Sequence, residues 1–547
     1  MERQIPRYGR IQFTLPQNSD RFFVQLPDGE KEAVTPFRYQ PTRFVYDRHG
    51  YESQEPTGPE ALLARFTPCQ LGEHCLLDEE GRLLERFACV PSDNPGYVCV
   101  SKKDGRYFAF SDGSSYVPIG LNMVVCDYDR LPAGNEHFQA SNQVATTGQI
   151  QCRRYFRAMA KAKVNYVRLW LSSPYLNART ELMGVHDLQV FNRLDAIMDM
   201  AREYGIYVKL CFEHFRTFWD EGHFAYKRIV DPDSGKQLRS EKEWVTQEKW
   251  NARWMEDIAP YIARYQNDPV VFAFELWNEM NCVQTGDFAD IAAFTARMLP
   301  RVKALSPKNL VVNSLGSFDE DGFQHEIDEF KKIPSMDFLQ VHRYLDQGAP
   351  LEICRTDPVA FSIEAVERAR LLTKPIILTE TGAVNDRHVG PFRFYACDHD
   401  GLIFHDVTYP ALFAGAAGSG HIWHWNAYVE PKNLWRHYLP LARAVEGIQM
   451  DEEGFETGRM DTPEAWVLVL KGKRHSLVLL RNKADRWDYV LRDGRDPAPA
   501  PALRLPLGGA KVETLYLMDE QGEAAFVEGG DICVPSFVHG CVLRIDH

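Results

Sequence analysis

The stretch VFAFELWNE at residues 271–279 is the most informative part of this chain. It is an apolar run of strand length that ends in Asn278 and Glu279, where a buried strand would surface into a loop. A second run, PIILTETG at residues 375–382, carries Glu380 at the corresponding place. Because parallel strands end at the same edge of a sheet, the two stretches predict a pair of carboxylates that face each other across a cleft.

The two runs belong to a longer series. Strand-like runs alternate with helical segments between residues 106 and 446, and they lie at residues 117–120, 166–170, 206–210, 271–277, 310–312, 338–341, 376–378 and 421–423. One amphipathic helix is expected to stop at Gly205, and another before Pro269. Eight such repeats predict the α/β class and a (β/α)8 TIM barrel, with its active site at the carboxyl ends of the strands.

Both flanks of this region have β character. Short alternating runs separated by Pro and Gly fill residues 1–105, which predicts an N-terminal β-sandwich. Apolar runs at 466–470, 476–480 and 541–545 predict a small C-terminal β-sandwich. The expected division is therefore 1–105 for the first sandwich, 106–446 for the catalytic barrel and 447–547 for the second sandwich.

The composition excludes several classes of protein. The chain has 547 residues, 45% of them hydrophobic and 12% aromatic, which is typical of a globular protein with large cores. Its formal net charge of −14 argues against nucleic acid as a partner, because binding to phosphates needs clustered Lys and Arg. A membrane partner is not expected either, since no apolar stretch reaches the roughly 18 residues that a span requires.

The cysteines and the amino terminus predict the compartment. The twelve cysteines include no Cys-x-x-Cys pair, so buried thiols are expected for most of them and no zinc site. The first ten residues, MERQIPRYGR, lack the apolar segment of a signal peptide. Together these features predict a cytoplasmic protein, although a secreted protein whose leader had been removed would look the same.

Alternation along the fourth run divides its side chains into two sets, which are Glu275, Trp277 and Glu279 on one side and Phe272, Phe274 and Leu276 on the other. The apolar set should pack on the helices, so the glutamates are expected to point into the barrel. A buried carboxylate needs a cation or several donors. For Glu275 the favoured interpretation is a buried ion pair with Arg168 or Lys209, in preference to a catalytic role.

The segments WNE at 277–279 and TETG at 379–382 resemble those of the retaining glycoside hydrolases of clan A, the barrel superfamily that includes the family 5 cellulases and mannanases. The resemblance covers the barrel, and further positions match the pattern of that clan: Asn165, Arg168, His214, His342, Tyr344, Trp423 and Trp425. In the N-terminal flank, LARFTP at 63–68 and FAFSDG at 108–113 resemble a β-sandwich module found before such barrels in bacterial cellulase-like proteins.

The resemblance implies that Glu279 is the general acid/base and Glu380 the nucleophile. A general acid must hold its proton near neutral pH, so burial and the charge of its partner should raise the pKa of Glu279. Arg168 and the hydroxyl of Tyr344 would keep Glu380 ionised. Asn278 would hydrogen-bond the sugar 2-hydroxyl.

The remaining matched residues are implied to bind substrate. His214 and His342 would bind hydroxyls or position the carboxylates, although either could be a structural histidine. Trp423 or Trp425 would form the apolar floor under the sugar ring, and the sequence does not distinguish the two.

Two features depart from the family pattern. A long insertion at residues 215–242, rich in aromatic residues, follows the third run and is expected to form a wall of the cleft, which favours a pocket over an open groove. His424 stands where an aromatic residue is expected, which leaves the leaving-group side of the site open.

These observations predict a retaining β-glycosidase that works by double displacement, with its two carboxyl groups about 5 Å apart. Exo action on β-linked oligosaccharides or glycosides is favoured, and β-mannoside, β-glucoside and β-galactoside all remain open. The alternatives are an endo-acting cellulase or mannanase, a transglycosylase, and a carbohydrate-binding barrel without catalysis. No metal or organic cofactor is expected, and self-association into a homo-oligomer stays open.

Overall fold

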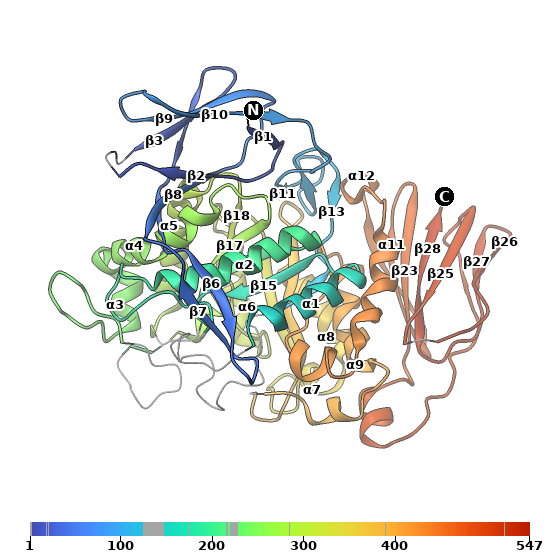
Figure 1. The fold of residues 1–547 in the computed structure, drawn as a ribbon. Helices are drawn as coiled ribbons and strands as arrows, with labels where there is room; N and C mark the ends of the chain where they lie inside the picture. The colour runs from blue at the N-terminus through green and yellow to red at the C-terminus, as the bar shows by residue number, and fades with distance from the viewer. Residues whose placement is uncertain are drawn as a thin grey trace.

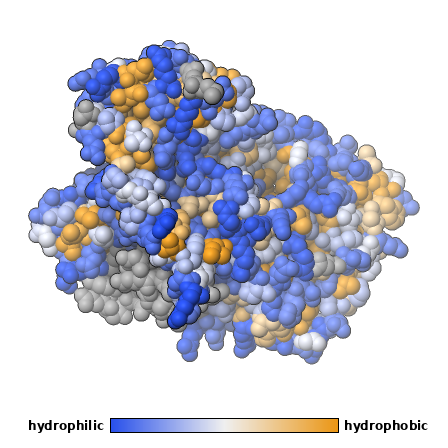
Figure 2. All heavy atoms as spheres, viewed as in Figure 1, coloured by the Kyte–Doolittle hydropathy of each residue, from blue (hydrophilic) through white to orange (hydrophobic). Residues whose placement is uncertain are grey.

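The computed structural model describes residues 3–547 except residues 18, 20, 124–146, 174, 215–216, 219–227, 284, 389 and 519 and the side chain of Asp461. Figure 1 shows a central barrel with a β-domain at each end of the chain, and the two termini lie on separate domains. Polar side chains cover much of the face shown in Figure 2, with hydrophobic side chains scattered among them. No helix in the described part of the chain is long and apolar enough to cross a membrane.

The N-terminal domain is a β-sandwich, as predicted. One sheet has the order β1 (Arg3–Pro6), β10 (Leu83–Val90), β9 (Gly72–Asp78), β3 (Phe22–Gln25) and β4 (Lys31–Val34), and the other the order β2 (Ile11–Leu15), β8 (Ala61–Phe66) and β5 (Phe37–Tyr39). The burial of β2 alternates strictly, which places Ile11, Phe13 and Leu15 in the core between the sheets. This core is a cluster of its own, separate from that of the barrel.

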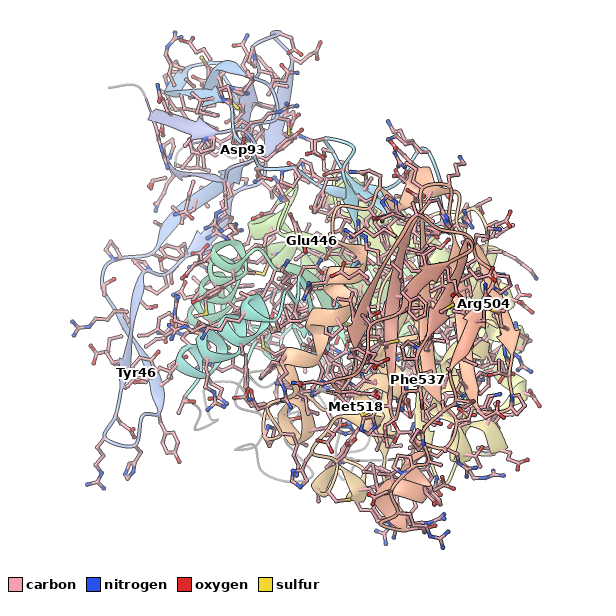
Figure 3. All side chains as sticks on the ribbon, turned by 90° about the vertical axis from the view of Figure 1, so that its right-hand side faces the viewer. Tyr46, Asp93, Glu446, Arg504, Met518 and Phe537 are labelled. Carbon is pink, nitrogen blue, oxygen red and sulfur yellow. The ribbon has the colours of Figure 1, made fainter. Side chains whose placement is uncertain are left out.

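Two small β-elements connect this sandwich to the barrel. The hairpin of β6 (Thr42–Tyr46) and β7 (Glu52–Pro56) leaves the sandwich and runs along the barrel, with Tyr46 far from the two sheets (Figure 3). β11 (Val98–Val100), β12 (Phe108–Phe110) and β13 (Ser115–Tyr116) form a three-stranded sheet. It packs at the amino ends of the barrel strands, where Phe108 contacts Phe272 and Phe338. The expected domain border at residue 105 falls within this sheet.

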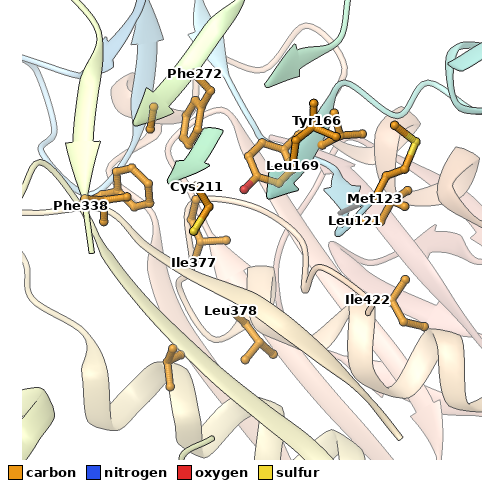
Figure 4. Close-up of a cluster of buried hydrophobic side chains, with 14 of the residues drawn as sticks. Leu121, Met123, Tyr166, Leu169, Cys211, Phe272, Phe338, Ile377, Leu378 and Ile422 are labelled. Atoms are coloured by element: carbon orange, nitrogen blue, oxygen red, sulfur yellow. The ribbon is translucent and has the colours of Figure 1, made fainter. Parts of the chain in front are cut away.

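Seven parallel strands and two bridging residues, Ser317 and Ile422, close the barrel. The strands are β14 (Gly120–Leu121), β15 (Tyr166–Trp170), β16 (Tyr207–Glu213), β17 (Val271–Trp277), β18 (Leu310–Val312), β19 (Leu339–Asp346) and β20 (Ile376–Val384). Ser317, which follows β18, forms a single parallel bridge with His342 of β19. Ile422 forms such bridges with Thr381 of β20 and with Leu121 of β14. The ring is therefore closed through Ile422, whose neighbours Leu121 and Leu378 share the core in Figure 4.

The strand predictions are confirmed for most of the barrel. The second, fourth and fifth runs match β15, β17 and β18 residue for residue, whereas β16, β19 and β20 extend several residues further toward the carboxyl edge. The eighth run, predicted at 421–423, forms single-residue bridges in place of a full strand. Backbone hydrogen bonds from His421 to Leu378 and from Trp423 to Thr381 nevertheless hold it in register with β20.

Helices surround the barrel strands in the described residues: α1 (Gln149–Lys161), α2 (Leu188–Tyr204), α3 (Glu241–Thr246), α4 (Glu248–Tyr265), α5 (Phe288–Leu305), α6 (Gln324–Lys331), α7 (Glu352–Thr356), α8 (Pro358–Ala369), α9 (Leu402–Thr408), α10 (Pro410–Phe413), α11 (Leu439–Val445) and α12 (Met450–Glu453). Asp187 caps α2 by accepting from the Gln189 N–H, and Gly205 ends it in the left-handed conformation (φ 68°). The predicted stop at Gly205 is thus confirmed.

The C-terminal domain is a second β-sandwich. Its larger sheet has the order β21 (Glu456–Asp461), β22 (Ala465–Lys471), β23 (His475–Asn482), β28 (Gly540–Asp546) and β25 (Lys511–Tyr516), and its smaller sheet the order β24 (Leu503–Leu505), β27 (Asp531–Val534) and β26 (Phe526–Glu528). Glu446, just after α11, lies between the barrel and this domain in Figure 3. We propose the three-part division of the chain on this basis.

Two details differ from the sequence expectations. Phe272 does not pack on the helices with Phe274; it lies at the bottom of the barrel against Tyr166 and Phe338, because the β16–β17 register shifts between Val208 and Lys209. Cys152 is disulfide-bonded, and of the ten free thiols in the described part of the chain only four are buried, whereas burial was expected for most.

Candidate active site

A buried ion cluster forms the floor of the site. The Arg168 guanidinium donates to both carboxylate oxygens of Glu275, from Nε at 2.7 Å and from Nη2 at 2.9 Å, and Lys209 Nζ lies 3.3 Å from the same carboxylate. Gln340 Nε2 adds a donor at 2.7 Å. Burial raises the pKa of Glu275, but Arg168 and Lys209 outweigh it and lower that pKa to about 2. The predicted ion pair is confirmed, and it fixes Arg168.

Arg168 also contacts the two residues Glu380 and Asn278. Its Nη1 donates to Glu380 Oε2 at 2.8 Å, and its Nη2 donates to Asn278 Oδ1 at 2.7 Å. The side chain is fully buried, so both charged contacts form away from solvent. One guanidinium therefore orients the nucleophile candidate and the amide that precedes the acid/base candidate.

Glu380 lies in β20 and accepts a second hydrogen bond. The Tyr344 hydroxyl donates to Glu380 Oε1 at 2.5 Å, opposite the oxygen that Arg168 holds. Burial raises the pKa of Glu380 above its ordinary value, and the contacts with Arg168 and Tyr344 offset only part of this rise. Tyr344 comes from β19, the neighbour of β20, where it pairs directly with Gly382.

Glu279 has a different environment. Its backbone is left-handed (φ 48°), and its N–H donates to Ser314 Oγ at 2.9 Å, so the turn after β17 is held by the segment after β18. Its Oε1 lies 2.8 Å from His342 Nδ1. Burial and then the negative charge of Glu380 raise the pKa of Glu279 well above its ordinary value.

The two carboxyl groups are close together. His342 Nδ1 lies 2.8 Å from Glu279 and 3.3 Å from Glu380 Oε2, and an oxygen of each carboxylate lies within 4.8 Å of the other. Burial and the nearby cations Arg168 and Lys209 hold the pKa of His342 well below its ordinary value, so the ring is neutral. The arginine and tyrosine contacts fall on Glu380 and favour its ionised form, so a single proton on this pair is expected to lie on Glu279.

Aromatic rings line the opposite side of the site. His214 stacks on Trp170 with ring centroids 4.4 Å apart, and Trp423 lies 4.9 Å from Trp170. Ser172 Oγ fixes the His214 ring through Nδ1. Trp423 is half-buried, whereas Trp425 is 1% exposed and belongs to the core. Of the two tryptophans that the sequence left open, Trp423 is therefore the one able to contact a sugar.

The structure describes His424 and part of the insertion at residues 215–242, the two features that depart from the family pattern. His424 is buried beside Tyr395, and burial lowers its pKa to about 3, so it is a neutral side chain of the core. Much of the insertion at 215–242, including Phe215 and Trp219, lies outside the described residues. Its described Phe218 stacks on Trp244 of α3 at 4.9 Å. Its expected role as a wall of the cleft stays a prediction.

The sequence reasoning missed three supporting residues. Trp170 and Arg168 share a face of β15, and Gln340 is a polar residue within an apolar run, so alternation could have indicated both Trp170 and Gln340. Ser314 lies beyond β18 in a segment without a distinctive pattern. Its role depends on how the loops after β17 and β18 meet, which the sequence does not carry.

Two groups in the described part of the chain could offer three metal ligands each: Glu279, His342 and Glu380, and Asp319, Asp346 and His388. The first group includes the carboxylate already neutralised by Arg168. In the second, a hydrogen bond to Asp346 raises the pKa of His388 despite partial burial, so a proton competes with a metal ion for that ring.

The fold and the opposed glutamates define a class of protein, the barrels that can cleave a glycosidic bond with two carboxylates. Residues 132–401, about half of the chain, match the family described as Cellulase (glycosyl hydrolase family 5). The barrel belongs to this family and to clan A, as the WNE and TETG segments indicated.

Several curated proteins are similar to the barrel. Mannan endo-1,4-beta-mannosidase 4 of Oryza sativa subsp. japonica is 26% identical over 264 residues, which cover 43% of this chain and 55% of the relative. Mannan endo-1,4-beta-mannosidase 7 of Arabidopsis thaliana is 26% identical over 231 residues, which cover 36% of this chain and 51% of the relative. The chain spans about half of the length of these relatives.

Solved structures extend the likeness to the whole fold. A candidate glycoside hydrolase from Bacteroides vulgatus ATCC 8482 is 13% identical with a TM-score of 0.57, and the match covers 100% of both chains. A second structure, a glycoside hydrolase, is 12% identical with a TM-score of 0.50 and covers 83% of this chain and 97% of the other. At these identities the likeness establishes the fold alone.

Proposed function

We propose that this protein is a retaining β-glycoside hydrolase with Glu380 as nucleophile and Glu279 as acid/base. The observation that carries the proposal is the unequal surroundings of the two carboxyls. Glu380 receives a cation and a hydroxyl donor, whereas Glu279 faces a neutral imidazole. Two carboxyls in such unlike surroundings, with an oxygen of each within 4.8 Å of the other, are suited to double displacement, for which carboxyl groups about 5 Å apart are typical.

In the first step, ionised Glu380 attacks the anomeric carbon while Glu279 gives its proton to the leaving oxygen. The glycosidic bond breaks and a glycosyl ester forms on Glu380. Asn278, held by Arg168 at 2.7 Å, contacts the 2-hydroxyl, and Trp423 supports the apolar face of the ring. In the second step, Glu279, now ionised, takes a proton from water, which cleaves the ester and restores both groups.

The proposed substrates are β-mannosidic oligosaccharides or glycosides. The support for mannose is that the curated relatives cited above are named mannan endo-1,4-beta-mannosidases. Exo action is proposed from the long insertion after the third strand, which would close one end of the cleft. The names of the same relatives favour endo action as the second candidate.

The test uses aryl β-glycosides with wild type, Glu380→Ala and Glu279→Ala. Glu380→Ala should abolish turnover, and azide should restore part of it with an α-glycosyl azide as product, because a small anion can fill the vacated space. Glu279→Ala should lower turnover of substrates with good leaving groups less than that of substrates with poor ones, because a good leaving group departs without a proton although the second step still lacks its base. Full activity in either variant, or inversion at the anomeric carbon followed by NMR, would contradict the assignment.

Product analysis separates the two modes of action. Release of mannose from mannotriose, without mixed oligomers from mannan, is expected for exo action. Mixed oligomers from mannan would establish the endo alternative.

A further inference from the structure

A groove on the outside of the barrel, between α1 and the short helix η7 (Leu434–Tyr438), is strongly basic. Its volume is about 460 Å³. Of the nine described residues that line it, four are cationic (Arg154, Arg157, Lys161 and Arg436) and none is acidic. The whole chain, by contrast, has a formal net charge of −14. The groove therefore concentrates positive potential on a protein that is acidic overall.

Helix α1, which lies on the outside of the barrel (Figure 1), places three of these cations on one face. Arg154, Arg157 and Lys161 are spaced three and four residues apart, so they lie side by side along the helix, whereas Tyr155 and Met159 face the core. Like charges at this spacing repel one another. The helix dipole favours Lys161 in the last turn, but it offers no such compensation to Arg157 in the middle of the helix. An anion bound between the two side chains would remove their repulsion.

The cations of the groove differ in whether they have a partner. Arg154 Nη2 lies 2.9 Å from Glu430, and the same carboxylate accepts a hydrogen bond from Trp435 Nε1 at 2.6 Å. The side chains of Arg157 and Lys161 are exposed, and neither forms an ion pair or a hydrogen bond with any described residue. The groove therefore has one fixed wall and two cations that the described residues do not neutralise.

The floor of the groove is apolar. It is formed by Ala158, Ala162, Leu439 and Trp435, and Trp435 is only 5% exposed. The groove is also larger than an inorganic ion requires, since pockets above about 300 Å³ are typical sites for organic molecules. A ligand that fits both the floor and the rim has an organic body and a group with a high negative charge.

We propose that this groove binds an organic phosphate monoester, with the phosphate on Arg157 and Lys161 and the organic body against Trp435. A phosphate monoester carries a charge of about −1.5 to −2 near pH 7, which matches two unpaired cations better than a single carboxylate does. The guanidinium can donate to two phosphate oxygens at once, and the ammonium adds a point charge. A phosphorylated sugar and a nucleoside monophosphate share this chemistry. None of the nine lining residues belongs to the candidate active site, so the proposal is independent of the glycosidase function.

Isothermal titration calorimetry of the full chain with glucose 6-phosphate and with AMP tests the proposal and distinguishes the two sources of the ligand. At least one ester should bind, whereas adenosine and inorganic phosphate should bind at least about tenfold more weakly, because each offers only part of the contacts. A double variant with Arg157→Gln and Lys161→Gln should lower the affinity for that ester by about tenfold or more, the loss expected for hydrogen bonds to charged groups. Both side chains are exposed and glutamine is a good helix former, so α1 should stay folded.

Arg153→Gln is the matched control. It removes a positive charge from the same helix, but Arg153 lies outside the groove and pairs with Glu203 at 2.8 Å on the surface. Its affinity should stay within about twofold of wild type, because solvent and salt screen an exposed charge that does not contact the ligand. Failure of both esters to bind, equal binding of inorganic phosphate, or equal affinity in wild type and the double variant would overturn the proposal. So would an equal loss in Arg153→Gln, because the binding would then reflect only the overall charge of the helix.

Discussion

At the scale of single residues, the protonation states of the two glutamates depend on a few donors. The Tyr344 hydroxyl and the Arg168 guanidinium both contact Glu380, while Glu279 contacts neither of them in the hydrogen bonds described above. The glutamates could be predicted from the sequence because each ends an apolar run. Which of the two glutamates contacts the Arg168 guanidinium depends on how β15, β19 and β20 are placed relative to one another.

Tyr344→Phe tests this distribution. Loss of the donor should raise the pKa of Glu380, so the acidic limb of the pH profile of kcat/KM should move to higher pH, because the nucleophile must be ionised to attack. The measurement is kcat/KM for an aryl β-glycoside as a function of pH. Tyr409→Phe, at a buried tyrosine that donates to the His437 carbonyl, is the control. An unshifted acidic limb in Tyr344→Phe would contradict the role given to this hydroxyl.

The ion cluster of Glu275, Arg168 and Lys209 also contributes to the stability of the fold. Its pKa is about 2 in the folded state against 4.5 for the ordinary group, so it stabilises the fold above pH 4.5, and this contribution is lost as pH falls toward 2. The difference corresponds to about 3 kcal/mol. Glu275→Gln should lower the free energy of unfolding at pH 7 by about 3–5 kcal/mol, since Arg168 and Lys209 lose their counter-charge. In urea titrations the deficit should shrink at pH 3; a constant deficit would count against the ion-pair explanation.

At the scale of elements, the β6–β7 hairpin ties the N-terminal domain to the barrel. Glu52 is 7% exposed and accepts from the Gln149 N–H at 2.8 Å, where α1 begins. The same carboxylate accepts from Tyr175 at 2.8 Å and from Arg193 at 3.2 Å. It caps a barrel helix and neutralises a buried arginine, although it belongs to a strand of another domain.

Glu52→Ala should release this hairpin. The change removes a buried ion pair with Arg193 together with the hydrogen bonds from Tyr175 and the Gln149 N–H, a loss that typically costs about 3–5 kcal/mol. Hydrogen exchange at residues 42–56 should accelerate strongly. Glu55→Ala lies in the same strand, but its side chain is 53% exposed and pairs with Arg43, so it should cost less than about 1 kcal/mol. Equal exchange in the two variants would show that Glu52 does not fasten the hairpin.

At the scale of the whole molecule, the two flanking domains are attached differently. Alternate residues of β22 and β23 face opposite ways: Val467, Val469 and Val478 fill the C-terminal sandwich, whereas Leu468, Leu470, Leu477 and Leu479 belong to the core of the barrel. The continuous apolar runs of these strands reflect burial on both faces. The N-terminal sandwich, by contrast, has a separate core.

A chain that ends at Glu446 should therefore fold poorly. The loss of β22, β23 and β28 exposes a leucine-rich face of the barrel core, and such large apolar patches promote aggregation. Size-exclusion chromatography and thermal unfolding are expected to show aggregates without a cooperative transition. Removal of residues 1–90, with β11 to β13 retained, should leave a soluble barrel with a lower unfolding midpoint. A monomeric, cooperatively unfolding 1–446 chain would contradict this view of the interface.

The sequence by itself determined the repeat of strands and helices, the β character of both flanks and the two glutamates, because apolar periodicity and strand-end position are local properties of the chain. Only the tertiary structure decided that Trp423 and not Trp425 reaches the site, that Phe272 turns to the barrel floor, and that Glu52 caps a helix of another domain. It also brought Asp319, Asp346 and His388 together from one strand end and two loops. These outcomes depend on strand register, ring closure and domain contacts between residues far apart in sequence, and no local pattern records them.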